Sequence, residues 1–351
     1  MANISPDISF LTSYVRGQHA KLLSTEDFEN LINKPYEAFI NHLTSFEIGE
    51  ILRLEPSYQS HEIERILTRQ LLDQYDFILQ NMPKWGKEFL EAYMIKFEVM
   101  NLQRIIRYLY SKAQVNLRDV INLRAQEMLG RTSFIAKLLQ SEDLGVFLER
   151  IKLTEYKKVI ETSEILYSKV GDIWPLEFAL NAHYLNLMLE KAQKLPRNQR
   201  SGALSFVHQE LITSVLLVIL KADFVNVDVK DALELITLPK DIPFRRQIVS
   251  LADERSLNID LEILKSLNQT KLTEGIERYE KDKMFLHIEI ALRARELEFI
   301  RKVYYSDFGL LSILCYLKQY EAQIQDLNKL LYLKEYKFPV EKTRELIVSL
   351  V

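Results

Sequence analysis

The chain has 351 residues, of which 48% are hydrophobic, and it contains only nine glycines and nine prolines. This length supports a sizeable core and two or three domains, and a composition rich in Leu, Ile, Glu and Lys favours helices over sheets. The net charge of −3 argues against dedicated binding of nucleic acid or of an anionic membrane surface.

The only cysteine, Cys315, lies among apolar neighbours, and an internal disulfide is excluded. We therefore expect a buried, unreactive thiol in a protein of a reducing compartment. The start of the chain lacks the basic and apolar regions of a signal peptide. The longest apolar run, Val215–Leu220, is far shorter than the ~20 residues of a membrane span. These features predict a soluble protein.

The first 50 residues predict short amphipathic helices. One helix is expected between Phe10 and Leu23. Ser24 followed by Asp27 has the pattern of an N-cap with an acidic first turn, so a second helix should begin there. The Asn-Lys-Pro sequence at 33–35 ends it, and another short helix follows through Leu43.

One sequence pattern occurs three times along the chain. It consists of an aliphatic residue followed by glutamate, with leucine four and nine positions after the aliphatic residue. The copies begin at Ile63, Leu176 and Ile288, which are 113 and 112 residues apart. Each copy lies in a helical pattern, and Trp174-Pro175 is a suitable start for the second helix. The period predicts three related helical units.

The clearest single helix is predicted at Leu310–Glu335, where apolar residues recur at spacings of four and three. This face consists of Ile313, Leu317, Tyr320, Ile324, Leu327 and Leu331, while polar residues such as Glu321 lie off it. A displacement of 225 residues predicts a related helix around Ala92–Ile106. The copy in the middle unit, near Ile212–Lys221, aligns less cleanly. Short helices are expected after the long ones, at Val115–Val120, Val227–Leu233 and Val340–Leu346.

We therefore predict an all-α fold of three tandem, structurally similar helical domains. Their predicted bounds are residues 1–120, 121–240 and 241–351, each long enough for a small domain. A period this long differs from that of short solenoid repeats. Two segments, Lys152–Gly171 and Leu195–Gly202, are expected to be irregular additions to the second domain.

No pattern in the sequence predicts a catalytic, cofactor or metal site, so we do not expect an enzyme. The glycines form no phosphate-binding loop, and direct nucleotide binding is not expected. The sequence from His61 to Arg65 begins like a zinc-protease helix but has Arg where the second His is required. The six histidines are widely separated, and we expect surface or partly buried helix residues rather than metal ligands.

Two groups of charged residues allow alternative interpretations. The repeated glutamates either line a surface that meets a basic partner or pair locally beside the core, and the second interpretation is simpler; they are Glu64, Glu177 and Glu289. A basic helix face is better explained as a solvated surface than as a nucleic-acid site; it consists of Arg104, Arg107 and Lys112.

Three stretches resemble the C subunit of the archaeal and bacterial A/V-type ATPases, which corresponds to the d subunit of the eukaryotic vacuolar ATPase. They are Tyr14–Leu31, Phe89–Arg107 with its Asn-Leu and Ile-Ile-Arg sequences, and Ile288–Ile347, and they span nearly the whole chain. The sequence also departs from the family pattern. Tyr332 stands where the third unit should have Arg, and Asp326 stands where Asn or another polar residue is frequent. The middle unit has Ser214 and Ile219 at the polar positions.

The resemblance implies three domains around a pseudo-threefold axis, forming a funnel on the cytoplasmic end of the membrane proteolipid ring. The funnel would receive the end of the central stalk. The protein would thus be a non-catalytic rotor subunit, coupling stalk to ring for ATP-driven ion transport or ATP synthesis. It would be peripheral on the cytoplasmic face of the membrane and associate with it only through the ring. Candidate partner contacts are Asn101, Arg104, Asp326 and Lys329.

Two alternatives remain at the level of sequence. One is a helical scaffold or adaptor unrelated to ATPases, which would form an extended array without closure. The other is an all-α enzyme whose site is assembled from distant residues, which would show a deep pocket with perturbed acids or histidines. The transported ion, the direction of the reaction and the group of organisms are left open.

Overall fold

The computed structural model describes residues 6–54, 59–112, 121–224, 228, 230–243, 245–253 and 270–349. Every regular element in these residues is a helix, which confirms the predicted all-α class. The chain forms two compact units, one of Met1–Pro83 with Leu264–Val351 and one of Lys84–Ile263. The predicted domain boundaries near residues 120 and 240 stay a prediction.

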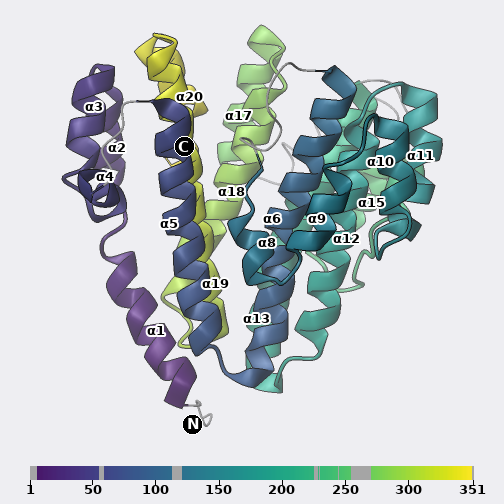
Figure 1. Cartoon of the computed structure of the whole chain (residues 1–351), viewed down its shortest axis with the longest axis horizontal. Coiled ribbons are helices and arrows are strands. Elements are labelled where there is room, and N and C mark those ends of the chain that lie inside the picture. The colour runs from purple at the N-terminus through teal and green to yellow at the C-terminus, as the bar shows by residue number, and fades with distance from the viewer. Residues whose placement is uncertain are drawn as a thin grey trace. The chain divides into compact units, whose positions relative to one another are not determined.

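The first unit combines both ends of the chain and is coloured purple to dark blue and light green to yellow in Figure 1. It also contains a 3₁₀ turn, Glu47–Gly49. Its described helices are α1 (Pro6–His19), α2 (Thr25–Ile32), α3 (Tyr36–Leu43), α4 (Ile51–Leu54), α5 (Ser60–Asn81), α17 (Thr270–Asp282), α18 (Leu286–Tyr304), α19 (Leu310–Glu335) and α20 (Val340–Leu346).

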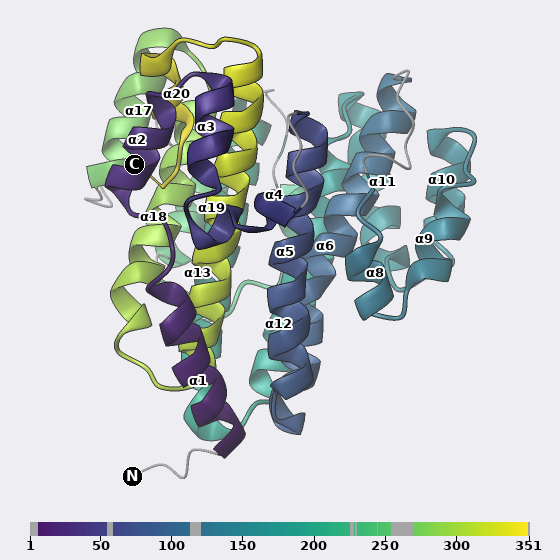
Figure 2. The ribbon, with the colours of Figure 1, turned by 60° about the vertical axis from the view of Figure 1, so that its left-hand side comes forward.

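Helix α19 is the core of this unit, and its bounds confirm the prediction from the apolar spacing. It packs against α1, α5 and α18, which surround it in Figures 1 and 2. Because neighbours cover several sides, residues off the predicted face are buried too. Glu321, for example, is only 7% exposed, and Tyr75 of α5 donates a 3.5 Å hydrogen bond to its carboxylate.

The second unit is the continuous stretch of the chain between α5 and α17. Its longest helices contain the middle copy of the repeated pattern and both long helices that were compared with α19. Its described helices are α6 (Lys84–Ser111), α8 (Arg124–Met128), α9 (Thr132–Leu138), α10 (Leu144–Ile151), α11 (Lys157–Val170), α12 (Trp174–Gln193), α13 (Arg197–Phe224), α14 (Lys230–Leu233) and α15 (Arg245–Asp253).

The three copies of the repeated pattern all lie in long helices, α5, α12 and α18. In each unit, a helix that carries the pattern packs along the long helix of another repeat. Helix α12 packs along α6 in the second unit, and α5 packs along α19 in the first. Hence the start of the second repeat packs on the end of the first, and the start of the first repeat packs on the end of the third.

Several local predictions are confirmed because short-range signals determine them. Ser24 caps α2, and its side chain and that of Asp27 bond each other's backbone N–H groups in a capping box. Helix α20 has the predicted bounds, and α12 begins at Trp174 with Pro175 in its first turn. The short helix expected at Val115–Val120 lies outside the described residues, as does part of Val227–Leu233, where α14 is described.

The prediction of two irregular additions is wrong. Most of Lys152–Gly171 forms α11, and Gly171 is its left-handed C-cap, with φ of 72° and its N–H bonded to the carbonyl of Tyr167. Residues 197–202 form the first turns of α13, whose N–H groups at Gln199 and Arg200 bond the Pro196 carbonyl. Gly171 thus marks the end of a helix and Pro196 the start of one. The residue type alone does not distinguish a helix boundary from a loop.

Candidate partner-binding site

The four predicted partner-contact residues lie in different units. Asn101 and Arg104 are on α6, in the second unit, whereas Asp326 and Lys329 are on α19, in the first. Asn101 is 1% exposed and exchanges hydrogen bonds with the backbone of Asn122, 2.7 Å to its carbonyl and 3.0 Å from its N–H. Asn101 therefore fixes the segment before α8 on α6. Arg104 is partly exposed.

Asp326 and Lys329 together hold the C-terminal tail, which we define as residues 346–349. Asp326 is 1% exposed, and its carboxylate accepts hydrogen bonds from the N–H groups of Val348 and Ser349, at 3.2 and 2.7 Å. The Lys329 ammonium donates to Asp326 Oδ1 and to the Leu346 carbonyl, each at 2.9 Å. The buried carboxylate is thus paired and hydrogen-bonded, as a buried charge requires.

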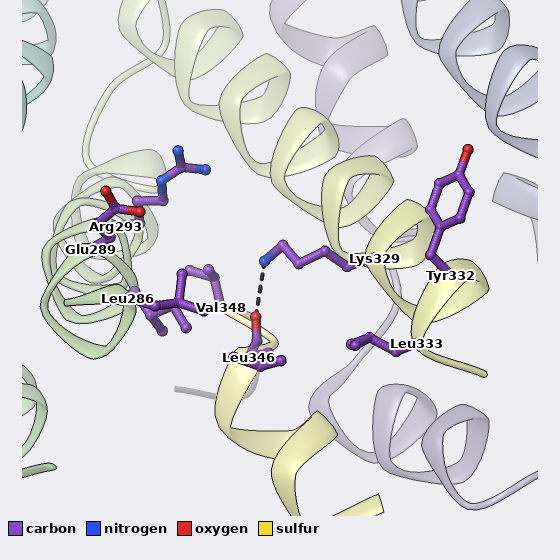
Figure 3. A pocket seen from close by; sticks show the side chains of 9 residues that line it. Leu286, Glu289, Arg293, Lys329, Tyr332, Leu333, Leu346 and Val348 are labelled. Atoms are coloured by element: carbon purple, nitrogen blue, oxygen red, sulfur yellow. Dashed lines mark hydrogen bonds between the residues drawn. The ribbon is translucent and has the colours of Figure 1, made fainter. Parts of the chain in front are cut away.

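Lys329 also lines a pocket of about 400 Å³ between α18, α19 and the tail, which we call the α18–α19 pocket. Figure 3 shows Lys329 reaching from α19 to the tail, with Glu289 and Arg293 opposite on α18. Tyr332 and Leu333 extend the α19 wall. The apolar floor belongs to a small buried cluster that contains Ile290, Ala294, Leu297 and Val348.

A second pocket, of about 430 Å³, is lined in part by the tail residue Ser349. Its lining is more polar and includes His19, Arg301, Gln319 and Gln323. Gln323 exchanges hydrogen bonds with the backbone of Leu23, at 3.0 and 2.7 Å, so this amide fixes the segment between α1 and α2. Burial lowers the pKa of His19, which stacks on Tyr304 with ring centres 4.1 Å apart.

Two of the repeated glutamates pair within the chain, with partners that are 70 and 268 residues away in sequence rather than local. Glu177 accepts a 2.5 Å hydrogen bond from Arg107 Nε, and Glu64 accepts one of 2.5 Å from the Tyr332 hydroxyl. Burial and the contact with Glu64 raise the pKa of Tyr332 well above its usual value. Tyr332 follows Arg107 by 225 residues, the same displacement that relates α19 to α6. Corresponding positions of the two long helices therefore bind corresponding glutamates of the repeated pattern. Glu289 lines the α18–α19 pocket.

The sequence interpretation missed a buried charged cluster in the second unit. Glu98 on α6 is fully buried, and Arg131 binds it with two hydrogen bonds, of 2.5 and 2.8 Å. The Tyr156 hydroxyl donates a third, of 2.7 Å, and Arg131 also pairs with Glu155. Arg131 and Tyr156 are the N-caps of α9 and α11, so the cluster ties both helix starts to α6. The only sequence signal for this cluster was the position of the acidic Glu98 between the apolar residues Phe97 and Val99.

Three chemically reactive side chains of the described residues, those of Cys315, His208 and His287, are buried. No group of three His, Cys, Asp or Glu residues in the described part of the chain is arranged to hold a metal ion. Cys315 is fully buried, as predicted, and burial raises the pKa of its thiol. Two histidines are more buried than expected, His208 and His287, and His287 Nε2 lies 2.7 Å from Asp282 Oδ2.

One described helix segment, Arg197–Ala222 in α13, is long and apolar enough to cross a membrane. Of its most apolar window, 78% is buried inside the protein. A buried core helix passes the same test of length and composition, so this segment is weak evidence for a membrane span. Its apolar side chains include Leu211, Val215 and Ile219, which contribute to the core.

Comparison with known proteins gives one consistent result. Residues 11–346 match the model of the ATP synthase (C/AC39) subunit family. An A-type ATP synthase C subunit from Pyrococcus abyssi is 22% identical over 346 residues, which cover 97% of this chain and 90% of that protein. The protein of the same name from Thermococcus kodakarensis is 25% identical over 350 residues, with coverage of 97% and 90%. That from Methanocaldococcus jannaschii is 23% identical over 359 residues, with coverage of 97% and 86%.

Proposed function

Since the chain belongs to the ATP synthase (C/AC39) subunit family, we propose that it is the non-catalytic coupling subunit of an A/V-type ATPase rotor. In this role it joins the central stalk to the membrane proteolipid ring and transmits torque for ATP-driven ion transport or ATP synthesis. The family match over residues 11–346 carries the proposal, because it covers both compact units. It favours this role over an adaptor unrelated to ATPases.

The packing within each unit suits a part that transmits torque. Long helices lie along one another, α12 on α6 and α5 on α19, and close-packed interiors have low compressibility. Hydrogen bonds between distant parts of the sequence reinforce both pairs: Arg107 with Glu177, and Tyr332 with Glu64. These contacts support a stiff coupling rather than a flexible linker.

The same pairing supports the proposed arrangement of three domains, residues 1–120, 121–240 and 241–351, in a pseudo-threefold funnel. If each repeat starts on the end of the preceding one, the third must return to the first, which closes a ring. The α5–α19 contact is such a return. The closed funnel remains part of the proposal, and so does its place on the cytoplasmic face of the membrane.

The exposure of the four candidate residues divides their roles. Asn101 and Asp326 are 1% exposed and bond backbone groups of this chain. Arg104 is partly exposed, and the Lys329 side chain is 36% exposed. We therefore assign partner contact to Arg104 and Lys329, whose long side chains can present a charge at the surface. Asn101 and Asp326 position the backbone nearby.

The proposal is tested by isolating the tagged full-length chain from detergent-solubilised native membranes and identifying the retained proteins by mass spectrometry. We expect central-stalk and proteolipid subunits to be recovered and to be displaced by excess untagged chain. The full-length protein is needed, because removing Leu310–Val351 would remove α19, the core of the first unit. Recovery of no ATPase subunit at any detergent strength would overturn the proposal.

A further inference from the structure

We propose that the α18–α19 pocket is the docking site for an acidic amphipathic helix of another subunit in the complex. The identity of the partner as an ATPase subunit rests on the proposed function. Its chemistry follows from the shape, apolar surface and charge of the pocket and its rim, all within the first unit.

The pocket has the size for inserted side chains. Its volume is about 400 Å³, near the lower end of the ~300–1,000 Å³ typical of ligand pockets. The buried residues Ile290 and Val348 form an apolar floor. Leu286, Leu333 and Leu346 add to the walls (Figure 3). One or two leucine-sized side chains of a partner would bury apolar surface here.

Exposed apolar residues continue from the pocket onto the two turns beside it. Because α18 and α19 are joined by a short connection, the start of α18 and the end of α19 lie at the same end of the unit, as Figures 1 and 2 show. These turns carry large apolar side chains with exposed fractions of 38–79%: Met284, Leu286, Tyr336, Phe338 and Val340. Such a concentration is typical of a protein-binding surface.

The charge of this end is complementary to an acidic partner. Arg293 in the pocket and Lys283 and Lys337 on the turns are exposed, and no ion pair links them to described residues. Asp282 is already bonded to His287, and Glu341 to Arg344. Glu289 lines the pocket, and Glu335 and Glu345 are exposed acids close to it in sequence. Carboxylates spaced along a partner helix would fit the three cations.

The backbone at both turns is left-handed at the lysines. Lys283 and Lys337 have positive φ angles, of 61° and 53°, in positions that end α17 and α19. Glycine is the usual residue there, since a Cβ atom is strained in this conformation. Lys112 at the end of α6 has the same conformation, with φ of 52°, so at these turns the backbone only fixes where the two cations lie.

A protein helix fits this surface better than a lipid membrane. Lysines with exposed apolar side chains would also suit an anionic lipid surface. However, the site is a concave pocket between two helices, and the flat surface of a bilayer does not fill such a pocket. A helix that carries leucine-type residues at spacings of three and four can fill such a pocket and direct its acids to the rim.

Cross-linking in the assembled complex tests the proposal. Tyr336, at the rim, is 79% exposed, and in Tyr336→Cys it becomes the accessible thiol for a benzophenone maleimide. The native Cys315 is fully buried with a raised thiol pKa, so the unsubstituted chain should take up no label. Illumination should link residue 336 to a predicted helical segment of another ATPase subunit that combines acids with leucine-type residues.

Charge reversal in the pocket supplies the second measurement. We expect Arg293→Glu to weaken association with the cross-linked subunit by about tenfold, with a reduced dependence on salt. Lys302→Glu is the matched control, because Lys302 is an exposed cation at the other end of α18. It should leave the affinity unchanged.

The outcomes separate the two proposals. If the chain is absent from the purified complex, the proposed function fails. If the chain is present but residue 336 links only to lipid, to this chain or to a segment without acids, the docking proposal alone is wrong. Equal affinity of the Arg293→Glu and Lys302→Glu variants would also overturn it.

Discussion

The hydroxyl of Tyr332 donates a 2.5 Å hydrogen bond to Glu64, across 268 residues of sequence. The corresponding bond in the second unit joins Arg107 to Glu177, and Arg107 precedes Tyr332 by 225 positions. A tyrosine thus performs the part that an arginine has elsewhere in the chain. Both bonds connect the end of one repeat to the beginning of another, and both lie between long helices that pack together.

Removing this hydroxyl should loosen the α5–α19 contact. We expect Tyr332→Phe to lower the free energy of unfolding by about 1 kcal/mol, the typical net value of one hydrogen bond. Tyr332→Arg should lose less, because arginine also donates to carboxylates. Urea denaturation measures the difference. Tyr336→Phe is the control, since Tyr336 is 79% exposed, and equal stabilities of the two Phe variants would show that the bond contributes nothing.

Glu98 should be far more important for stability than glutamates in surface pairs. Glu98→Ala leaves Arg131 without its main partner in a partly buried site, and breaking such a pair costs about 3–5 kcal/mol. The control is Glu88→Ala, which removes an ion pair with Lys191 at the surface and should leave the unfolding midpoint unchanged. Thermal unfolding of both variants checks this, and similar midpoints would contradict the role of the cluster.

Gly275 allows α17 and α18 to approach closely. A Cβ at this position would lie 2.3 Å from the Cβ of Ala291 and 2.9 Å from the His287 carbonyl oxygen. We therefore expect Gly275→Ala to destabilise the protein by about 1–3 kcal/mol, despite the better helix propensity of alanine. Gly17→Ala has open space around the new methyl group and should stabilise α1 slightly. Chemical denaturation that ranks these variants in the opposite order would disprove this packing.

Lys334 should make stability depend on pH in the alkaline range. Its ammonium donates to the carbonyls of Ile32 and Lys34, at 2.7 and 2.5 Å, and burial lowers its pKa to about 8 from the usual 10.5. Between these two values the unfolded chain holds a proton that the folded chain has lost, so the contribution of Lys334 to stability rises with pH. Below pH 8 both states are protonated and the contribution is constant.

This effect is measured as the difference between the unfolding free energies of the native chain and Lys334→Met at several pH values. The difference should shift in favour of the native chain as the pH rises from about 8 to 10.5. Lys337→Met, three residues later at an exposed position, is the matched control for the loss of a lysine. A constant difference for Lys334→Met would contradict the lowered pKa.

The elements that were predicted correctly depend on short-range patterns. The bounds of α19 follow from apolar spacings of four and three, and the start of α2 follows from Ser24 and Asp27, three residues apart. The error at α11 has a similar local origin. Gly171 has the residue type of a loop, although its positive φ ends a helix of 14 residues.

The candidate site could be predicted only in part, because its contacts are not local in sequence. Asp326 and Lys329 are recognisable as polar positions on α19, but the bonds of Asp326 reach N–H groups 22 and 23 residues away. Likewise, Glu98 meets partners 33 and 58 residues away. Helical periodicity identifies the buried face of a helix and carries no information about which distant segment covers it.

The most direct test of the coupling role compares ATP hydrolysis with ion transport in vesicles that contain the ATPase with or without this chain. Without the chain, we expect hydrolysis to continue while transport is lost, and addition of the purified chain should restore transport. Transport at the normal ratio to hydrolysis in the absence of the chain would contradict the proposed coupling between stalk and ring.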